Sequence, residues 1–246
     1  MNNIEINISD IVSRAWELTK KHGIVIAVLI FAVSVISNLG ASMSFPWKEY
    51  MHVIQSNDPE LIREFGESMP GYNFTQLLSS LIMTIASVGF LNMALMLVKN
   101  SDAKISFNAF KLPLNTYALY IATSIVYGII TVLGSMLCII PGIFLAVRLM
   151  FAPIRMIEHP EDGFIESFKY SWRATQGNFW NLFLLGLLSF VFCILGFMAC
   201  CIGIYFAYAL IMFIFVIAYL DTKNIISPNS ESASENSADS GYVKTY

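Results

Sequence analysis

The stretch that decides the fold is CIIPGIFLAVRLMFAPIRMIEHP, residues 138–160. It is almost wholly apolar, yet it carries two arginines, Arg148 and Arg155, whose guanidinium groups stay charged at any physiological pH. Long apolar segments also lie on both sides of it. Whether the chain can hold two charges here therefore depends on whether the surrounding solvent is water or lipid.

Charged residues are scarce and are confined to short segments. The 246 residues are 57% hydrophobic and 13% charged, whereas about 25% of the residues of a soluble domain are charged. A transmembrane helix needs about 20 mostly apolar residues, and a soluble helical core would need polar residues every few positions. The runs without Asp, Glu, Lys or Arg are residues 23–47, 68–98, 112–147 and 174–220. The sequence therefore predicts an all-α integral membrane protein.

Six transmembrane helices are expected, arranged as three helical hairpins in a membrane domain of residues 23–220. Proline cannot continue a helix and glycine eases a chain reversal, so Pro141, Gly142 and Gly203 are predicted to make the helix turns of the second and third hairpins. The predicted spans are 23–45, 76–98, 115–138, 142–157, 179–199 and 203–220.

The Lys and Arg residues indicate which ends of the spans face the cytoplasm, because cytoplasmic segments are enriched in them. If both termini are cytoplasmic, 12 of the 14 basic residues lie on that side or, for Arg148, within a span. Only Lys48 and Arg63 lie outside. This topology places residues 99–113 and 158–178 inside and makes residues 46–75 the outer loop.

Two segments outside the spans have recognisable local signals. In the outer loop, Asp58 is a candidate helix cap and Pro59 suits the first helical position, so a short surface helix is expected there. Residues 221–246 are rich in Ser, Asn and acids and poor in apolar residues. They are predicted to form a disordered cytoplasmic tail.

A segment of mixed polarity precedes each predicted hairpin, at residues 1–22, 104–114 and 161–180. Each carries Lys or Arg on one side and apolar or aromatic residues on the other. Amphipathic helices of this kind lie in the plane of the lipid headgroups. The expected interfacial anchors are Trp16, Trp172, Arg173 and Trp180.

The segments also resemble one another in sequence. AWELTKKHG at 15–23 aligns with SWRATQGNF at 171–179, and LGSMLCIIPGIF at 133–144 aligns with LGFMACCIGIYF at 195–206. We interpret this as an internal repeat of an interfacial helix followed by a helical hairpin. Chance similarity among apolar sequences is the alternative.

Three stretches resemble a known family: RAWELTKKHGIVIAVLI (14–30), GFLNMALMLVKNSDAKISFNAF (89–110) and the run from IIPGIF to GNFW (139–180). They are similar to the membrane domain of glycerophosphoryl diester phosphodiesterases and its stand-alone bacterial relatives, which are mostly of unknown function. The resemblance implies an all-helical integral membrane protein, and the expected location is the bacterial cytoplasmic (inner) membrane. It does not imply phosphodiesterase activity, because the enzymes carry that chemistry on a separate soluble barrel, for which this sequence has no room.

The two arginines lead to different expectations. Arg155 lies near the inner end of the fourth span and is expected to anchor there and to pair with Glu158. Arg148 lies about 10 Å deeper, where a charge costs about 2.5–3.5 kcal/mol on insertion scales. No predicted span holds an acid, so its partners are expected to be uncharged groups, water or a lipid phosphate. Arg148 is either structural, at a helix weakened by Pro153, or, with Arg155, a site for an anionic headgroup or solute.

Enzymatic and metal-binding motifs were not found. The sequence has no H-E-x-x-H, no phosphate-binding glycine loop, no G-x-S-x-G and no C-x-x-C pair. EHPED at 158–162 could bind a cation but is better interpreted as a solvated loop. No cofactor and no metal are therefore expected.

The predicted function is that of a non-enzymatic protein that binds, organises or protects a membrane lipid or protein. Its expected partners are the bilayer and an anionic lipid or another membrane protein, with no nucleic acid and with the oligomeric state open. The alternative is a small transporter or channel component for an anionic solute or lipid. Internal repeats and an intramembrane arginine favour that alternative, and the lack of other intramembrane charges opposes it.

Overall fold

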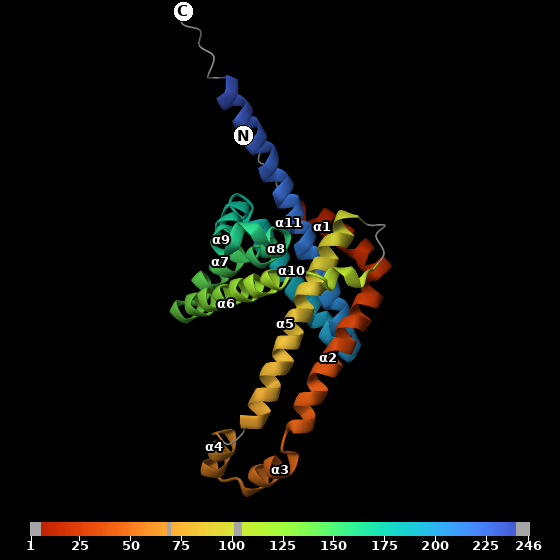
Figure 1. Ribbon diagram of the computed structural model, residues 1–246, viewed down its shortest axis with the longest axis vertical. Helices are drawn as coiled ribbons and strands as arrows, with labels where there is room; N and C mark the ends of the chain where they lie inside the picture. Colours follow the sequence, from red (N-terminus) through yellow and green to blue (C-terminus); the bar gives the residue numbers. More distant parts are fainter. Residues whose placement is uncertain (1–5, 68–69, 101–104, 240–246) are drawn as a thin grey trace, which may run out of the picture. The chain divides into compact units, whose positions relative to one another are not determined.

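The computed structural model describes residues 6–67, 70–100 and 105–239, and no strand occurs in these ranges (Figure 1). The described part of the chain contains six helical segments that are long and apolar enough to cross a membrane. They are Ile8–Leu39, Phe74–Lys99, Leu114–Met136, Ile139–Glu158, Phe179–Met198 and Gly203–Asn224. The predicted all-α class with six apolar helices is therefore confirmed at this level, as expected for a multi-pass membrane protein.

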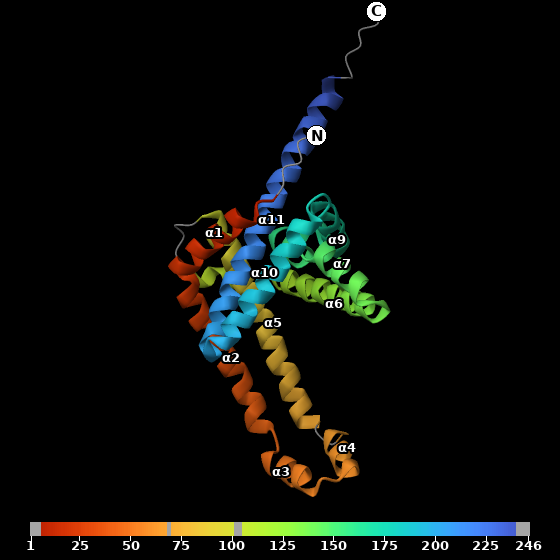
Figure 2. The same ribbon diagram turned by 180° about the vertical axis from the view of Figure 1, so that it is seen from behind.

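The chain divides into two compact units, one of residues 28–87 and one of the remaining residues. Figure 2 shows the same helices from behind. The α-helices are α1 (Ile8–Leu18), α2 (Ile24–Ser44), α3 (Trp47–Ser56), α4 (Pro59–Glu67), α5 (Pro70–Lys99), α6 (Leu114–Leu137), α7 (Ile139–Leu149), α8 (Ala152–Glu158), α9 (Gly163–Ala174), α10 (Phe179–Met198) and α11 (Cys200–Asp239).

The N-terminal segment that was predicted to be amphipathic runs without a break into the first apolar helix. The Asn7 side chain caps α1 by accepting a hydrogen bond from the Asp10 N–H at 3.3 Å. A π-helical turn, η1 (Thr19–Gly23), then joins α1 to α2. Residues 1–5 of the predicted 1–22 segment lie outside the described residues.

The unit of residues 28–87 contains the predicted outer loop. Asn57, in the left-handed region with φ 52°, ends α3. The Asp58 carboxylate then accepts a hydrogen bond from the Glu60 N–H at 2.9 Å, and Pro59 is the first residue of α4. The predicted short helix with its cap is therefore confirmed. Between α2 and α5, the Ser79 hydroxyl donates to the Ser37 carbonyl at 2.7 Å.

The chain reverses before Pro141 and Gly142, and not at these residues as predicted. The reversal lies at Cys138, which is extended, and both residues belong to the first turn of α7. The first N–H groups of a helix have no intrahelical partner, so proline removes no hydrogen bond there. Gly203 likewise lies within α11, after the end of α10 at Ala199.

Both glycines allow two helices to approach closely. A Cβ atom on Gly142 would lie 2.2 Å from the Ser135 hydroxyl oxygen of α6. A Cβ atom on Gly203 would lie 2.6 Å from the Gly196 carbonyl oxygen of α10. The role of these residues is therefore close helix contact rather than chain reversal.

The fourth predicted span, 142–157, is two helices. α7 ends at Leu149 and α8 begins at Ala152, with Pro153 in its first turn. A 3₁₀ turn, η3 (Pro160–Asp162), then leads into α9.

Two further segments differ from their predictions in form. The amphipathic stretch at 104–114 contains a 3₁₀ turn, η2 (Phe107–Phe110), and residues 101–104 lie outside the described residues. The tail predicted to be disordered from residue 221 continues α11 to Asp239, and residues 240–246 are outside the description.

Candidate functional site

The break between α7 and α8 is bridged by a hydroxyl group from α9. Ser171 Oγ donates to the Arg148 carbonyl at 2.9 Å and accepts from the Phe151 N–H at 3.1 Å. Thr175 Oγ1, one turn further along, lies 3.4 Å from the same carbonyl. Both hydroxyl-bearing residues are fully buried. An unpaired backbone group in an apolar setting is costly, so α9 satisfies groups that the broken helix cannot satisfy itself.

The guanidinium group of Arg148 lies among three aromatic rings. Its central carbon is 5.2 Å from the ring centroids of Phe144 and Trp172 and 5.7 Å from that of Phe179. One of its terminal nitrogens is 3.4 Å from Thr175 Oγ1, and its Nε is buried without a hydrogen-bond partner. These contacts match the expected uncharged partners. The ring faces attract the cation through their quadrupoles.

Two polar side chains of the apolar segments bond backbone carbonyls away from Arg148. The Asn92 amide donates to the Ala109 carbonyl at 2.8 Å. The Tyr127 hydroxyl donates to the Ala146 carbonyl at 3.3 Å. The aromatic cage was missed in the sequence because its rings come from α7, α9 and the start of α10.

Arg155 pairs with Asp162, so the predicted pair with Glu158 is wrong. Its Nε lies 2.9 Å from Asp162 Oδ2, because η3 folds the chain back towards α8. The guanidinium also lies 4.5 Å from the ring centroid of Tyr170. Burial raises the pKa of Tyr170 to about 12, and its hydroxyl is buried without a hydrogen-bond partner. Arg148 and Arg155 therefore lie on different helices with different surroundings and do not form one site.

Glu158 is the centre of an ionic cluster that the sequence did not reveal. Its side chain is only 6% exposed. Its Oε1 lies 2.7 Å from Lys99 Nζ and 2.8 Å from Lys223 Nζ, and its Oε2 accepts from the Tyr219 hydroxyl. The cluster joins the C-terminal ends of α5 and α8 to the middle of α11. These partners lie about 60 residues away along the chain, so no local pattern announces them.

Among the described residues, those of the EHPED stretch included, no group of three or more His, Cys, Asp or Glu side chains is placed to hold a metal ion. His159 Nδ1 lies 3.0 Å from Glu161 Oε1, and His159 Nε2 lies 3.1 Å from Lys223 Nζ. The ionisable side chains of the EHPED stretch contact one another and neighbouring lysines.

A hollow of about 600 Å³ lies against α9. The Lys169 and Arg173 side chains on its rim are mostly exposed, and both contact Glu166, at 3.4 and 2.9 Å. Two cations and one carboxylate leave this rim with a net positive charge. The residues that line the hollow are Leu149, Glu166, Phe168, Lys169, Trp172 and Arg173.

Trp172 belongs both to this hollow and to the cage around Arg148. The contact with Arg148 therefore holds the Trp172 ring, which forms part of the wall of the hollow. Such a site offers an anionic ligand two flexible cationic groups beside an apolar surface. The arrangement has no nucleophile activated by a neighbouring base among the residues just named.

The other predicted anchors are exposed. Trp16 is partly exposed and contacts the Phe206 ring edge-to-face at 6.2 Å. Trp180, the most exposed of them, contacts Phe179 and Phe183. Their position at the membrane interface stays a prediction.

The comparisons with known proteins give one match. Residues 64–227 match the model of a family described as a domain of unknown function, DUF7847. No curated protein and no solved structure matches the chain. The matched range contains the Arg148 cage, the Glu158 cluster and the hollow beside α9.

Proposed function

Because this chain belongs to the DUF7847 family, a domain of unknown function, we propose its role from its own side chains: it is a non-enzymatic multi-pass membrane protein that binds anionic lipid. The observation that carries the proposal is the hollow beside α9. Its rim holds Lys169 and Arg173, and Trp172 forms part of its wall.

The chemistry of this hollow fits a lipid phosphate. Long basic side chains can extend along an apolar surface and place their charge at the headgroups. The planar Arg173 guanidinium can bind two phosphate oxygens while it still contacts Glu166, since it has five N–H donors. Indole rings favour the same interfacial layer. The hollow therefore combines an apolar wall for lipid chains with cations for the headgroup.

The contacts of Arg148 and Arg155 favour structural roles for both. The Arg148 guanidinium lies in the aromatic cage, and the Arg155 guanidinium is paired with Asp162. This moves the proposed anion site from Arg148 and Arg155 to Lys169 and Arg173. Arg148 then acts through Trp172, whose ring it holds in place.

The proposed location is the bacterial cytoplasmic membrane, with both termini in the cytoplasm. Anionic leaflets attract basic segments near the surface by about 1 kcal/mol per Lys or Arg. The segments proposed to face the cytoplasm hold most of the basic residues. The three-hairpin arrangement, the interfacial helices, the internal repeat and the resemblance to the phosphodiesterase membrane domain belong to the same proposal. The paired glycines of α6–α7 and α10–α11 support the repeat.

A transporter or channel component for an anionic solute or lipid is the second candidate. The ionic cluster around Glu158 favours it, since buried charged groups near a membrane are often functional. The cluster also places a buried carboxylate directly after the predicted fourth span, which itself contains no acid.

The lipid proposal is tested by neutralising the rim of the hollow. We expect the double variant Lys169→Gln/Arg173→Gln, purified in mild detergent, to lose most of its co-purified phosphatidylglycerol or cardiolipin, measured by mass spectrometry. The matched control is Lys48→Gln/Arg63→Gln, which removes two exposed basic residues of α3 and α4 and should retain the lipid.

Unchanged anionic lipid in the rim variant would contradict the proposal. The transporter candidate has its own readout, anion flux into liposomes that contain the purified protein. Flux that is lost in Glu158→Gln and kept in the rim variant would favour transport over lipid binding.

A further inference from the structure

We propose that α3 docks on the lipid leaflet at which α2 ends, through an apolar stripe on one side of the helix. The stripe consists of Trp47, Met51 and Ile54, at positions i, i+4 and i+7, which share one side of a helix. The three residues are 57%, 53% and 50% exposed. This inference does not depend on the proposed lipid site at α9.

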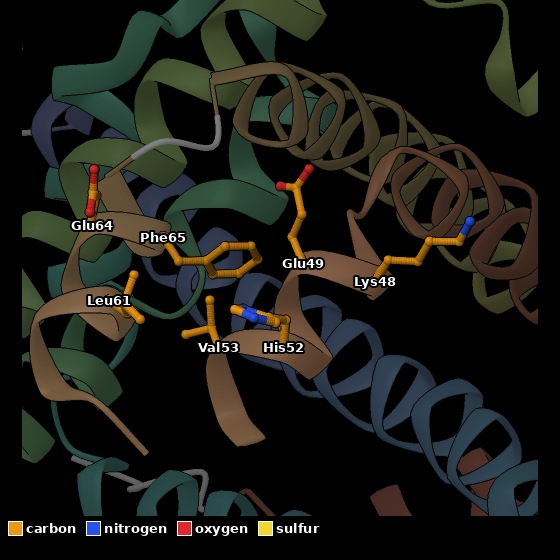
Figure 3. A pocket seen from close by; sticks show the side chains of 7 residues that line it. All are labelled: Lys48, Glu49, His52, Val53, Leu61, Glu64 and Phe65. Carbon is orange, nitrogen blue, oxygen red and sulfur yellow. The ribbon is translucent and has the colours of Figure 1, made fainter. Parts of the chain in front are cut away.

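The other sides of α3 have different surroundings. Val53 is buried, and the ring centroid of Tyr50 lies 6.1 Å from that of Phe65 of α4. Lys48, Glu49 and His52 lie away from the stripe and help to line a hollow of about 470 Å³ between α3 and α4. Figure 3 shows the Phe65 ring near Val53 and His52, with Lys48 extending away from them. Only the stripe is an exposed apolar side of α3.

The connection to α2 indicates what covers the stripe. Only Phe45 and Pro46 separate the end of α2 from Trp47, and two residues span at most about 7 Å. The Trp47 indole N–H donates to the Ser42 carbonyl at 3.2 Å, one of the last carbonyls of α2, which have no partner within the helix. The first residue of the stripe is therefore held against the end of a membrane-spanning helix.

The stripe continues the exposed apolar surface of that helix. Met43, in the last turn of α2, is 85% exposed, and Leu39 one turn earlier is also exposed. These residues belong to or directly follow an apolar segment suited to face lipid chains. A short amphipathic helix that follows at once and begins with tryptophan fits the headgroup layer.

The experiment compares two neighbouring residues of α3, Met51 in the stripe and His52 in the lining of the hollow between α3 and α4. A nitroxide label is attached to Met51→Cys or, as the matched control, to His52→Cys, in protein whose native cysteines are replaced by serine. The protein is reconstituted in phosphatidylcholine liposomes. We expect the label at Met51 to collide with oxygen several-fold more than with a water-soluble nickel complex, and the label at His52 to show the reverse.

Equal accessibility at the two positions would overturn the proposal. So would dipolar broadening at Met51 that disappears when unlabelled protein is added, because it would show that a second copy covers the stripe. If the labelled variants do not fold, Trp47 is kept as the only tryptophan by Trp→Phe changes at positions 16, 172 and 180. Brominated lipids should then quench the fluorescence of Trp47. If they quench it no more than they quench tryptophan in water, the proposal is also overturned.

Discussion

Arg148 shows how one residue can carry a charge in an apolar setting without a carboxylate. A charge at the centre of a membrane helix costs about 2.5–3.5 kcal/mol on insertion scales. A cation over an aromatic ring gains about 0.5–1 kcal/mol when exposed and about 2 kcal/mol or more when desolvated. Three rings surround this guanidinium within 5.7 Å. Their combined attraction is therefore comparable with the cost of inserting the charge.

Removing the caged cation should destabilise the membrane domain. We expect Arg148→Ala to lower the thermal unfolding midpoint in detergent, because Trp172 and Thr175 lose their shared partner. Arg148→Lys should restore the midpoint only in part, since a lysine lacks the planar group that stacks on rings. Arg173→Ala, on the exposed side of α9, is the control and should unfold like the native protein. An Arg148→Ala midpoint equal to that control would show that the cage contributes no stability.

The bridging hydroxyl of Ser171 should matter as much as the charge. Ser171→Ala leaves the Phe151 N–H without its partner, and an unsatisfied buried group costs about 1–3 kcal/mol. Ser167→Ala is the matched control, since this equally buried serine of α9 bonds only the Gly163 carbonyl of its own helix in the described structure. Equal unfolding free energies for the two variants would refute the bridge.

Helix packing in this protein depends on glycine contacts between neighbouring elements. Gly134 of α6 and Gly142 of α7 lie so close that a Cβ on the first would be 3.2 Å from the second's Cα. Gly196 of α10 and Gly203 of α11 form the equivalent contact in the aligned stretch. Small residues at such crossings let helix backbones approach, which favours association in lipid.

A methyl group at one of these crossings should separate the helices. We expect Gly142→Ala to destabilise the protein by about 1–3 kcal/mol, the usual cost of overpacking. Gly128→Ala in α6 is the control, because a Cβ there meets nothing within 4 Å. The free energies of unfolding in detergent compare the two variants. A Gly142→Ala variant with the same free energy of unfolding as the native protein would mean that α6 and α7 can move apart without loss of stability.

At the scale of the whole molecule, the expected topology is inferred from the positions of the basic residues. Lys and Arg orient membrane helices because they are retained on the cytoplasmic side. The two basic residues of the α3–α4 region, Lys48 and Arg63, are outnumbered by those near the opposite ends of the spans. We therefore expect α3 and α4 outside and η2 and α9 inside.

Labelling of intact cells tests this topology. A membrane-impermeant maleimide should modify Gln55→Cys in α3 and spare Asn108→Cys in η2, both exposed positions, in protein without its native cysteines. Both should react after the cells are opened, which controls for reactivity. Modification of Asn108→Cys alone in intact cells would reverse the topology.

The sequence by itself determined the helical class, the six apolar segments and the capped start of α4. Each of these follows from a local signal: apolar length, or a cap and a proline at adjacent positions. Arg148 also stood out locally, because a charge within an apolar run is rare. The partners of Arg148 had no local signal in the sequence. The position of the chain reversal before Pro141 had none either, because proline is compatible with the first turn of a helix.

Only the tertiary structure decided what the polar groups contact. Ser171 reaches a backbone break 20 residues earlier, and Glu158 meets lysines about 60 residues away in either direction. In lipid-facing helices most sides are equally apolar, so the sequence does not mark which side packs against protein. The pairing of polar groups therefore had to come from the packing of distant helices, because each buried donor or charge must find its partner wherever the fold brings one within reach.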